Sequence, residues 1–207
     1  VVALYNGGQQ RNFEYFPQKP HNELNASFSD SMMADIAKNY GSDSVFRVKS
    51  DDYLSYIVVE VMPVINESFN VYEDKSATVI AGSSMGGLMS MYAIGEYPDV
   101  FGSAICMSTH WPGGYAPNED VPQVFQSYIA ANIKQDKVGK IYFDYGTETL
   151  DEMYEPFQMQ VDSILEWNGF RKDVNWRTQK FQGAAHDELS WAKRLHIPLL
   201  FTLKKQR

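Results

Sequence analysis

Residues 78–89 read TVIAGSSMGGLM, and this stretch decides the fold class and contains the first candidate for a catalytic residue. Its apolar start is typical of a short strand, its glycines mark a tight turn, and its end opens a helix. A Gly-x-Ser-x-Gly pattern between a strand and a helix is typical of a nucleophilic serine held in a sharp turn. The positions two before and two after such a serine must be small, and here they are Gly82 and Gly86. We therefore predict that Ser84 is a nucleophile.

The helix that follows Ser84 provides a second part of the predicted site. Its N-terminal end carries N–H groups without intrahelical partners and a partial positive charge. The backbone N–H of Met85 is therefore a candidate donor to an oxyanion, the charged oxygen that forms when a nucleophile attacks a carbonyl. The alternative is a glycine-rich turn without chemistry, but the flanking strand and helix favour the nucleophile.

Outward from this stretch, short apolar runs alternate with segments of helical period. The predicted strands cover residues 78–81, 101–108, 140–145 and 174–181, and the predicted helices cover residues 84–97, 123–133, 150–167 and 187–203. This alternation predicts one domain over residues 1–207 of the α/β-hydrolase class, with a mostly parallel sheet and helices on both faces. The first strand, apolar throughout, is predicted to be central and covered on both faces. The catalytic residues should therefore lie in the loops that follow residues 81, 108, 145 and 181, at the carboxyl ends of the predicted strands.

The first seventy residues are less regular. Residues 1–5 read VVALY and predict a buried strand that ends at a turn signal. Residues 9–49 are polar and irregular, with a weak helix over residues 30–39. Residues 51–69 have helical spacing, and Pro63 is expected to kink or divide that helix. Since the sequence starts inside a predicted strand, we expect that N-terminal strands are absent from it, and no compartment is predicted.

The composition excludes several classes of protein. The chain carries 18 basic and 26 acidic side chains, a formal net charge of −8. This balance argues against a nucleic-acid partner and against an anionic membrane surface. No apolar stretch is long enough to span a bilayer. The single cysteine, Cys106, lies in an apolar run and is predicted to be buried and inert. The four histidines lack metal-ligand spacing, so we predict no metal.

A serine hydroxyl needs a neighbouring base, and His186 is the predicted base. In this fold class the order along the chain is serine, acid, histidine. His186 lies in a loop of small residues between the last strand and the last helix, where a base can reach the nucleophile. His196 falls inside a helical stretch, where a packed or surface role is favoured. His110 follows a different strand and is predicted to line the pocket instead.

Three carboxylates compete for the role of the acid after the strand over residues 140–145. They are Asp144, Glu148 and Asp151. Asp144 lies within the strand and is expected to point away. Thr149 and Glu152 have the spacing of a capping box, so Asp151 has an alternative role at a helix start. We favour Asp151 over Glu148, and Glu148 over Asp144.

With these positions in view, the chain resembles the putative-esterase family of α/β-hydrolases. That family includes feruloyl, acetylxylan and enterochelin esterases, S-formylglutathione hydrolase and mycolyltransferases. The segments that carry the resemblance extend from residue 1 to about residue 203 and include Trp191. They are VVALYN (1–6), RNFEYFP (11–17), AGSSMGGL (81–88), YPDVFG (97–102), MSTHW (107–111), DYGTE (144–148) and AAHDE (184–188).

The resemblance implies an eight-stranded type of sheet, ester hydrolysis and a triad that needs no cofactor. It implies that Ser84 and His186 are nucleophile and base, and that Trp111 lies beside an acyl pocket. It places Arg11 and Glu14 near the cleft, as a substrate contact or as a structural ion pair.

The sequence departs from the family pattern in two ways. The segment over residues 146–149 has a threonine where many members have the acid, which leaves Asp151 and Glu148 in competition. The family normally has three strands and a helix before the strand at residue 1, and one of their turns supplies the second oxyanion donor. The chain as given has no such segment.

Together these observations predict a serine carboxylic-ester hydrolase that works through an acyl-enzyme intermediate. By resemblance, its substrates are small-molecule or carbohydrate-linked esters, such as acylated carbohydrates or siderophore-like esters. The alternatives are an acyltransferase with the same triad and a non-catalytic ligand-binding member of the fold. The oligomeric state is not predicted.

Overall fold

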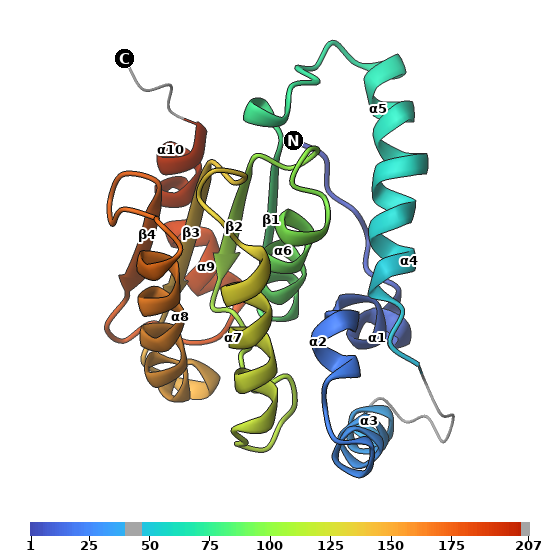
Figure 1. Ribbon diagram of the computed structural model, residues 1–207, viewed down its shortest axis with the longest axis vertical. Helices are drawn as coiled ribbons and strands as arrows, with labels where there is room; N and C mark the ends of the chain where they lie inside the picture. The colour runs from blue at the N-terminus through green and yellow to red at the C-terminus, as the bar shows by residue number, and fades with distance from the viewer. Residues whose placement is uncertain (40–46, 204–207) are drawn as a thin grey trace.

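A parallel four-stranded sheet forms the centre of the computed structural model, which describes residues 1–39 and 47–203. Its strands are β1 (Val79–Ser83), β2 (Ser103–Met107), β3 (Lys140–Tyr145) and β4 (Trp176–Lys180), and they lie side by side in chain order (Figure 1). Every neighbouring pair is parallel. All four strands therefore end at the same edge of the sheet.

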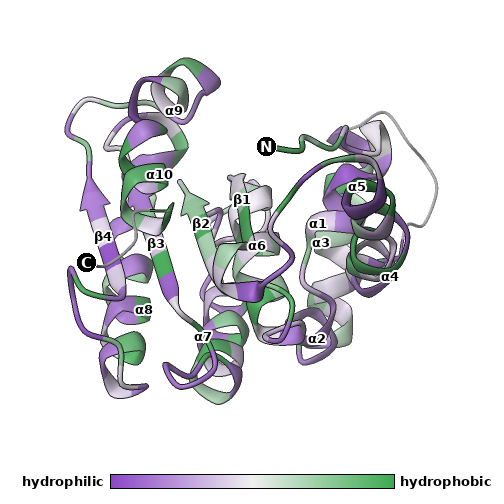
Figure 2. Ribbon diagram, turned by 90° about the horizontal axis from the view of Figure 1, so that it is seen from above, coloured by the Kyte–Doolittle hydropathy of each residue, from purple (hydrophilic) through white to green (hydrophobic). Residues whose placement is uncertain are grey.

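Helices cover both faces of this sheet. Those that connect consecutive strands are α6 (Met85–Glu96), α7 (Asp120–Asn132) and α8 (Glu155–Trp167). Because the strands follow chain order and parallel crossovers are right-handed, these three helices lie on one face (Figure 2). The opposite face carries α9 (Glu188–Arg194) and α10 (His196–Leu203). This arrangement confirms the predicted fold class.

Alternation along the strands divides the core between the two faces. On β2, Ala104 and Cys106 belong to the large cluster under α6, α7 and α8. Ile105 and Met107 point the other way and pack, with Tyr142 of β3, against α9 and α10. Each sheet face thus has its own apolar cover, and β2 is fully buried between them. The buried state predicted for Cys106 is confirmed, and burial raises the pKa of its thiol.

Most elements of the α/β part agree with the sequence patterns. The four strands and three connecting helices occur where the periodicity predicted them, and the ends of the strands, α6 and α7 shift by about three residues at most. The predicted helix over residues 150–167 is a 3-10 turn, η4 (Thr149–Met153), followed by α8. The predicted C-terminal helix is divided into α9 and α10.

The N-terminal region is more helical than its polar composition predicted. It contains the turn η1 (Gly8–Gln10) and the helices α1 (Arg11–Tyr15), α2 (Gln18–Asn22) and α3 (Ala26–Asn39). α3 includes the weak helix predicted over residues 30–39. The prediction of an irregular segment is therefore wrong for most of residues 9–39, and residues 40–46 lie outside the described residues.

The long helix predicted over residues 51–69 forms, and Pro63 changes its hydrogen-bond pattern. It runs as α4 (Ser50–Ser55), a π-helical segment η2 (Tyr56–Val61) and α5 (Met62–Ser68), with Pro63 in the first turn of α5. Proline has no N–H to donate and its ring crowds the preceding turn. The wider π-helical turns lie directly before it, where a kink or bulge is expected. A 3-10 turn, η3 (Lys75–Ala77), then leads into β1.

Two strand predictions are wrong. Residues 1–5 are exposed and form no strand, and they pass from the side of β1 towards the α4 and α5 helices (Figure 1). An apolar run becomes a strand only where a ladder partner is available, and these residues pair with no strand of the described sheet. β1 itself is an edge strand of that sheet, only half buried, with Ala81 exposed. A short apolar run does not distinguish a central from an edge strand.

Among the helices that the structure describes, none combines the length and hydropathy needed to cross a bilayer.

Candidate active site

Ser84 occupies a strained turn between β1 and α6. Its φ of 57° and ψ of −123° fall in a region that costs a non-glycine residue about 1–3 kcal/mol and that is found mainly at functional sites. Its backbone N–H donates to the carbonyl of Met107 at 2.9 Å, and its carbonyl accepts from Gly87 N–H at 2.9 Å. The turn is therefore fixed to β2 on one side and to the first turn of α6 on the other.

The two glycines around Ser84 differ in the space that surrounds them. A Cβ at Gly82 would overlap the backbone of Gly86, because the turn folds one residue directly onto the other. A Cβ at Gly86 would meet no atom within 4 Å. Only Gly82 thus meets the predicted steric requirement, and the prediction that Gly86 must also be small is wrong.

A chain of two hydrogen bonds joins the three residues favoured as nucleophile, base and acid. Ser84 Oγ lies 2.9 Å from His186 Nε2, and His186 Nδ1 lies 2.6 Å from Asp151 Oδ1. Ser84 follows β1, Asp151 lies in η4 after β3, and His186 lies in the loop between β4 and α9. An ionised carboxylate only accepts, so Nδ1 carries a proton and Nε2 presents a lone pair to the serine hydroxyl. This arrangement can move a proton from Ser84 to His186.

The Asp151 carboxylate is buried yet held in its charged form. Burial acts to raise its pKa, but hydrogen bonds from His186, Ser108 and the Gly146 N–H outweigh that effect and lower the pKa below its usual range. Ser108 Oγ and Gly146 N lie 2.6 Å and 2.5 Å from Oδ2. A carboxylate that accepts several such bonds remains ionised even without solvent.

The segment before Asp151 also fixes the backbone of His186. Thr149 Oγ1 accepts the His186 backbone N–H at 2.9 Å and donates to the carbonyl of Glu148 at 2.7 Å. Thr149 has a φ of 59°, and η4 has no side-chain cap. The predicted capping box of Thr149 and Glu152 is therefore wrong, because the threonine hydroxyl bonds across the loop to His186.

The two other candidate acids lie elsewhere. Glu148 is exposed, and its backbone N–H donates to the carbonyl of Ala184 at 3.1 Å. Asp144 is buried and forms an ion pair with Arg194 at 2.9 Å. Burial raises the pKa of Asp144 to about 6, against the opposing effect of Arg194.

His110 lies beside His186 in the same cluster, but its ring faces a hydroxyl and not a carboxylate. Its Nδ1 lies 2.6 Å from Tyr154 Oη, and its ring centroid is 6.3 Å from that of His186. Burial, and next the nearby His186, lower the pKa of His110 to about 4. At neutral pH His110 is uncharged, and its backbone N–H donates to the carbonyl of Ser84 at 3.3 Å.

Trp111 and Met85 were also predicted to belong to the site, and the structure places them differently relative to Ser84, His186 and Asp151. Trp111 is buried in the core, where its Nε1 donates to Gln158 Oε1 at 3.1 Å and its ring packs near Phe143. Met85 is buried as the first residue of α6, so its N–H is one of those without an intrahelical partner.

Arg11 and Glu14 do not form the expected pair. The Arg11 guanidinium lies 5.4 Å from the centre of the Tyr15 ring, and Glu14 pairs with Lys49 at 3.8 Å. The two residues are only three positions apart on the short helix α1, but their side chains take different neighbours.

Sequence reasoning missed a group of residues behind Asp151. Ser108, Arg194 and Trp191 meet there. Ser108 and Trp191 lie in segments that carry the resemblance, but no role was predicted for either of them. Ser108 lies at the end of a predicted strand, the place where functional residues gather, so its position was a usable signal. Arg194 offered no signal, because a basic residue in the last turn of a helix is expected on the surface.

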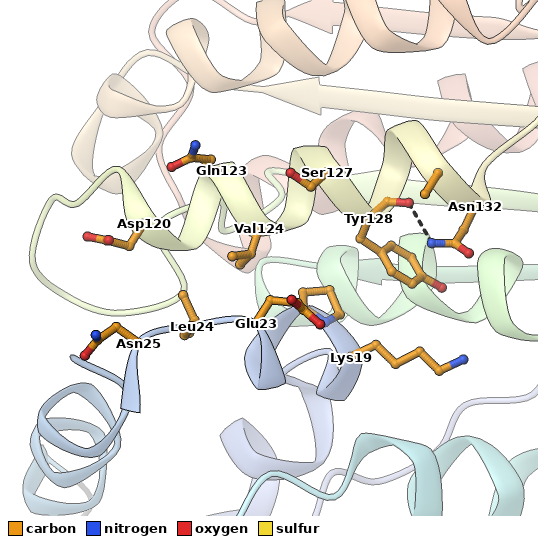
Figure 3. A pocket seen from close by; sticks show the side chains of 12 residues that line it. Lys19, Glu23, Leu24, Asn25, Asp120, Gln123, Val124, Ser127, Tyr128 and Asn132 are labelled. Carbon is orange, nitrogen blue, oxygen red and sulfur yellow. Dashed lines mark hydrogen bonds between the residues drawn. The ribbon is translucent and has the colours of Figure 1, made fainter. Parts of the chain in front are cut away.

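Two surface hollows lie away from the Ser84, His186 and Asp151 cluster. A hollow of about 580 Å³ lies between α2 and α7 (Figure 3). Figure 3 shows Lys19 and Glu23 on one side of it and Tyr128 and Asn132 on the other. A second hollow of about 480 Å³ lies between α3 and the loop over residues 114–118. Within the described ranges, no group of three or more His, Cys, Asp or Glu side chains could hold a metal ion.

The architecture is that of the α/β-hydrolases, as comparison with solved structures confirms. The chain is similar to the enterochelin esterase of Shigella flexneri, with a TM-score of 0.62 and 20% identity over 74% of this chain and 37% of that one. It is similar to the feruloyl esterase module of Clostridium thermocellum, with a TM-score of 0.62 and 15% identity over 80% of this chain and 63% of that one. The chain thus spans between about a third and two thirds of these solved chains.

Residues 22–197 match the family described as Putative esterase, and the chain belongs to that family. A segment is also similar to the uncharacterized protein YbbA of Bacillus subtilis, with 40% identity over 60 residues. That match covers 28% of this chain and 24% of YbbA.

The crowded turn gives a first prediction. Gly82→Ala should lower the free energy of unfolding by about 1–3 kcal/mol, because its Cβ forces the start of α6 away from β1. Gly86→Ala is the matched control and should stay within about 1 kcal/mol of the parent, since open space surrounds that position. Urea unfolding measures both. Equal effects of the two substitutions would contradict this account.

The buried His110 gives a second prediction. Its pKa in the folded protein, about 4, lies below its ordinary value of 6.5, so the unfolded chain takes up the proton first as the pH falls. Between pH 6.5 and pH 4 the unfolding free energy should therefore decrease by about 1–3 kcal/mol more in the parent than in His110→Gln. The exposed His196 provides the control, and His196→Gln should follow the parent curve. Parallel curves for the parent and His110→Gln would rule out a buried neutral imidazole.

Proposed function

We propose that this member of the esterase family is a serine carboxylic-ester hydrolase with Ser84 as nucleophile, His186 as base and Asp151 as acid. The observation that supports this most directly is the chain of hydrogen bonds, 2.9 Å and 2.6 Å long, from Ser84 Oγ through His186 to Asp151 Oδ1. The strained turn at Ser84 and the charged state of Asp151 agree with these roles.

The proposed reaction has two steps. His186 Nε2 takes the proton of Ser84 Oγ as that oxygen attacks the ester carbonyl, and the N–H of Met85 donates to the resulting oxyanion. The tetrahedral intermediate collapses, and His186 returns the proton to the departing alkoxide, which leaves as an alcohol. An acyl group is now attached to Ser84. A water molecule then gives a proton to His186 and attacks that acyl group, and the acid is released with Ser84 restored.

Asp151 has a defined role in this cycle. It fixes the tautomer in which His186 Nδ1 carries the proton, and it stabilises the positive imidazolium that forms in each step. Burial increases that stabilisation, because a charge pair away from solvent interacts more strongly. His110 assists by remaining neutral and so adding no competing positive charge beside His186.

We propose esters of aromatic acyl groups as the substrate class. The chain is similar in structure to an enterochelin esterase and to a ferulic acid esterase. In this chain, the aromatic rings of Tyr154 and Trp191 lie 5.7 Å and 5.0 Å from the His186 ring, both edge-on. Tyr154 is fully buried and packs against His186, whereas Trp191 is partly exposed, so the Trp191 ring is the one that can offer an edge contact to an aryl group. Hydrolysis of feruloyl, catechol-type and plain acetyl esters of one alcohol, compared by kcat/KM, tests this class.

The nucleophile is tested by a pair of neighbouring serines. Ser84→Ala should reduce the turnover of a chromogenic ester by at least about a thousandfold, because no other hydroxyl is hydrogen-bonded to His186 Nε2 in the described residues. Ser83→Ala, one position earlier, should leave kcat within about twofold. A fluorophosphonate should label the parent and Ser83→Ala at Ser84, as read by peptide mass spectrometry. Retained turnover and labelling in Ser84→Ala would exclude Ser84 as nucleophile.

The acid is tested by two isosteric substitutions. Asp151→Asn should lower kcat by about three to four orders of magnitude, since an amide stabilises the wrong histidine tautomer. Glu148→Gln should change kcat by no more than about threefold, because that side chain is exposed. Steady-state kinetics on the same ester compares them. The reverse ranking would assign the acid to Glu148.

A further inference from the structure

Ser108 lies directly behind Asp151, at the carboxyl end of β2. It is fully buried and has a φ of 41°, a left-handed conformation that is strained for a serine. Its Oγ is within hydrogen-bond distance of three side chains: Asp151 Oδ2 at 2.6 Å, Arg194 Nη2 at 2.7 Å and Trp191 Nε1 at 2.9 Å. A single hydroxyl thus connects the proposed acid to two residues of α9.

The chemistry of these partners fixes the direction of each hydrogen bond. A guanidinium and an indole N–H can only donate, and an ionised carboxylate can only accept. Arg194 and Trp191 therefore donate to Ser108 Oγ and occupy its lone pairs. The single proton of the hydroxyl is left for Asp151 Oδ2. The hydroxyl has no other orientation that satisfies all three neighbours.

This bond determines which carboxylate oxygen faces the base. Ser108 Oγ and Gly146 N–H both donate to Oδ2 of Asp151. Oδ1 then remains for His186 Nδ1. Rotation of the carboxylate would break two charge-assisted hydrogen bonds at once, and such bonds are stronger than those between neutral groups.

Arg194 is held in place by a second acid. Its Nη2 donates to Asp144 Oδ1 at 2.9 Å as well as to Ser108, while the Asp151 Oδ2 atom lies 3.9 Å away. Its guanidinium also lies 4.9 Å from the centre of the Phe181 ring. Arg194 is 4% exposed, and its Nε and Nη1 find no hydrogen-bond partner in the part of the chain that the structure describes. A buried guanidinium with two unpaired nitrogens lowers the stability of the fold. The presence of Arg194 is therefore better explained by the hydrogen bonds that its Nη2 donates than by a contribution to stability.

We propose that Ser108 is a positioning residue, which holds the Asp151 carboxylate in register with His186 and is itself oriented by Arg194 and Trp191. The inference rests on the proposed function of Ser84, His186 and Asp151. Ser108 does not touch the reacting atoms, because it lies on the side of Asp151 opposite to His186. Its effect should therefore fall on kcat and leave KM unchanged.

The test removes the hydroxyl in two ways. Ser108→Ala and Ser108→Gly should each lower kcat by about 10–100-fold with KM unchanged within about twofold. The glycine variant accepts the left-handed φ without strain, so it serves if the alanine variant folds poorly. Ser103→Ala is the matched control: Ser103 is buried at the opposite end of the same strand, where its Oγ accepts the Lys140 N–H at 3.2 Å. It should keep kcat within about twofold.

A second readout does not depend on turnover. The proton between His186 Nδ1 and Asp151 should give a far-downfield resonance in one-dimensional proton NMR, identified by its absence in His186→Gln. We expect Ser108→Ala and Ser108→Gly to broaden or lose this resonance, while Ser103→Ala and Ser84→Ala retain it. If the parent hydrolyses no ester, the proposed function fails, and this resonance still decides the role of Ser108.

Three outcomes would overturn the inference. The first is a resonance and a kcat that remain at parent values in both Ser108 variants. The second is a loss of kcat in Ser103→Ala equal to that in Ser108→Ala, since that points to general destabilisation. The third is a failure of both Ser108 variants to fold, which would make Ser108 a purely structural residue.

Discussion

The charge of one buried carboxylate organises the candidate site. Asp151 is 1% exposed, and an isolated charge in such a place would cost far more than the fold can supply. It is stabilised by donors from three separate loops: Ser108 after β2, Gly146 after β3 and His186 after β4. Since these donors satisfy one carboxylate together, the loops cannot move independently. The position of His186 relative to Ser84 follows from this constraint.

The parallel sheet makes such a convergence possible. Met107 on β2 is opposite Ser83 on β1 and Asp144 on β3, so the strands end in step at one edge. The backbone continues this ladder past the strand ends, since Ser84 N–H donates to Met107 and Ser108 N–H donates to Asp144, both at 2.9 Å. The crossover helices all lie on one face, and the other face is left for α9. From there α9 can bring Trp191 and Arg194 to the rear of the site.

The sequence predicted those features that depend on local pattern. The periodicity of the apolar residues predicted the strands and helices of the sheet. It also predicted that Ser84, Asp151 and His186 lie in loops after the strands, and the carboxyl ends of parallel strands bring such loops together however far apart they are in the sequence. Features that depend on distant partners were not predictable. The run over residues 1–5 has the composition of a strand but no ladder partner in the described sheet, and Arg194 has the position of a surface residue but is buried against Asp144. The Thr149 hydroxyl had the spacing of a cap and bonds instead to His186.

Two neighbouring histidines show how the partner sets the chemistry of an identical side chain. His186 Nδ1 faces a carboxylate, which stabilises a positive imidazolium, whereas His110 Nδ1 faces the Tyr154 hydroxyl, which offers no charge. Burial therefore lowers the pKa of His110 to about 4, while His186 keeps a charged partner 2.6 Å away. A proton taken from Ser84 can then reside only on His186. A second imidazole that titrated near neutrality at this distance would repel that charge, so the neutrality of His110 favours the role of base that we propose for His186.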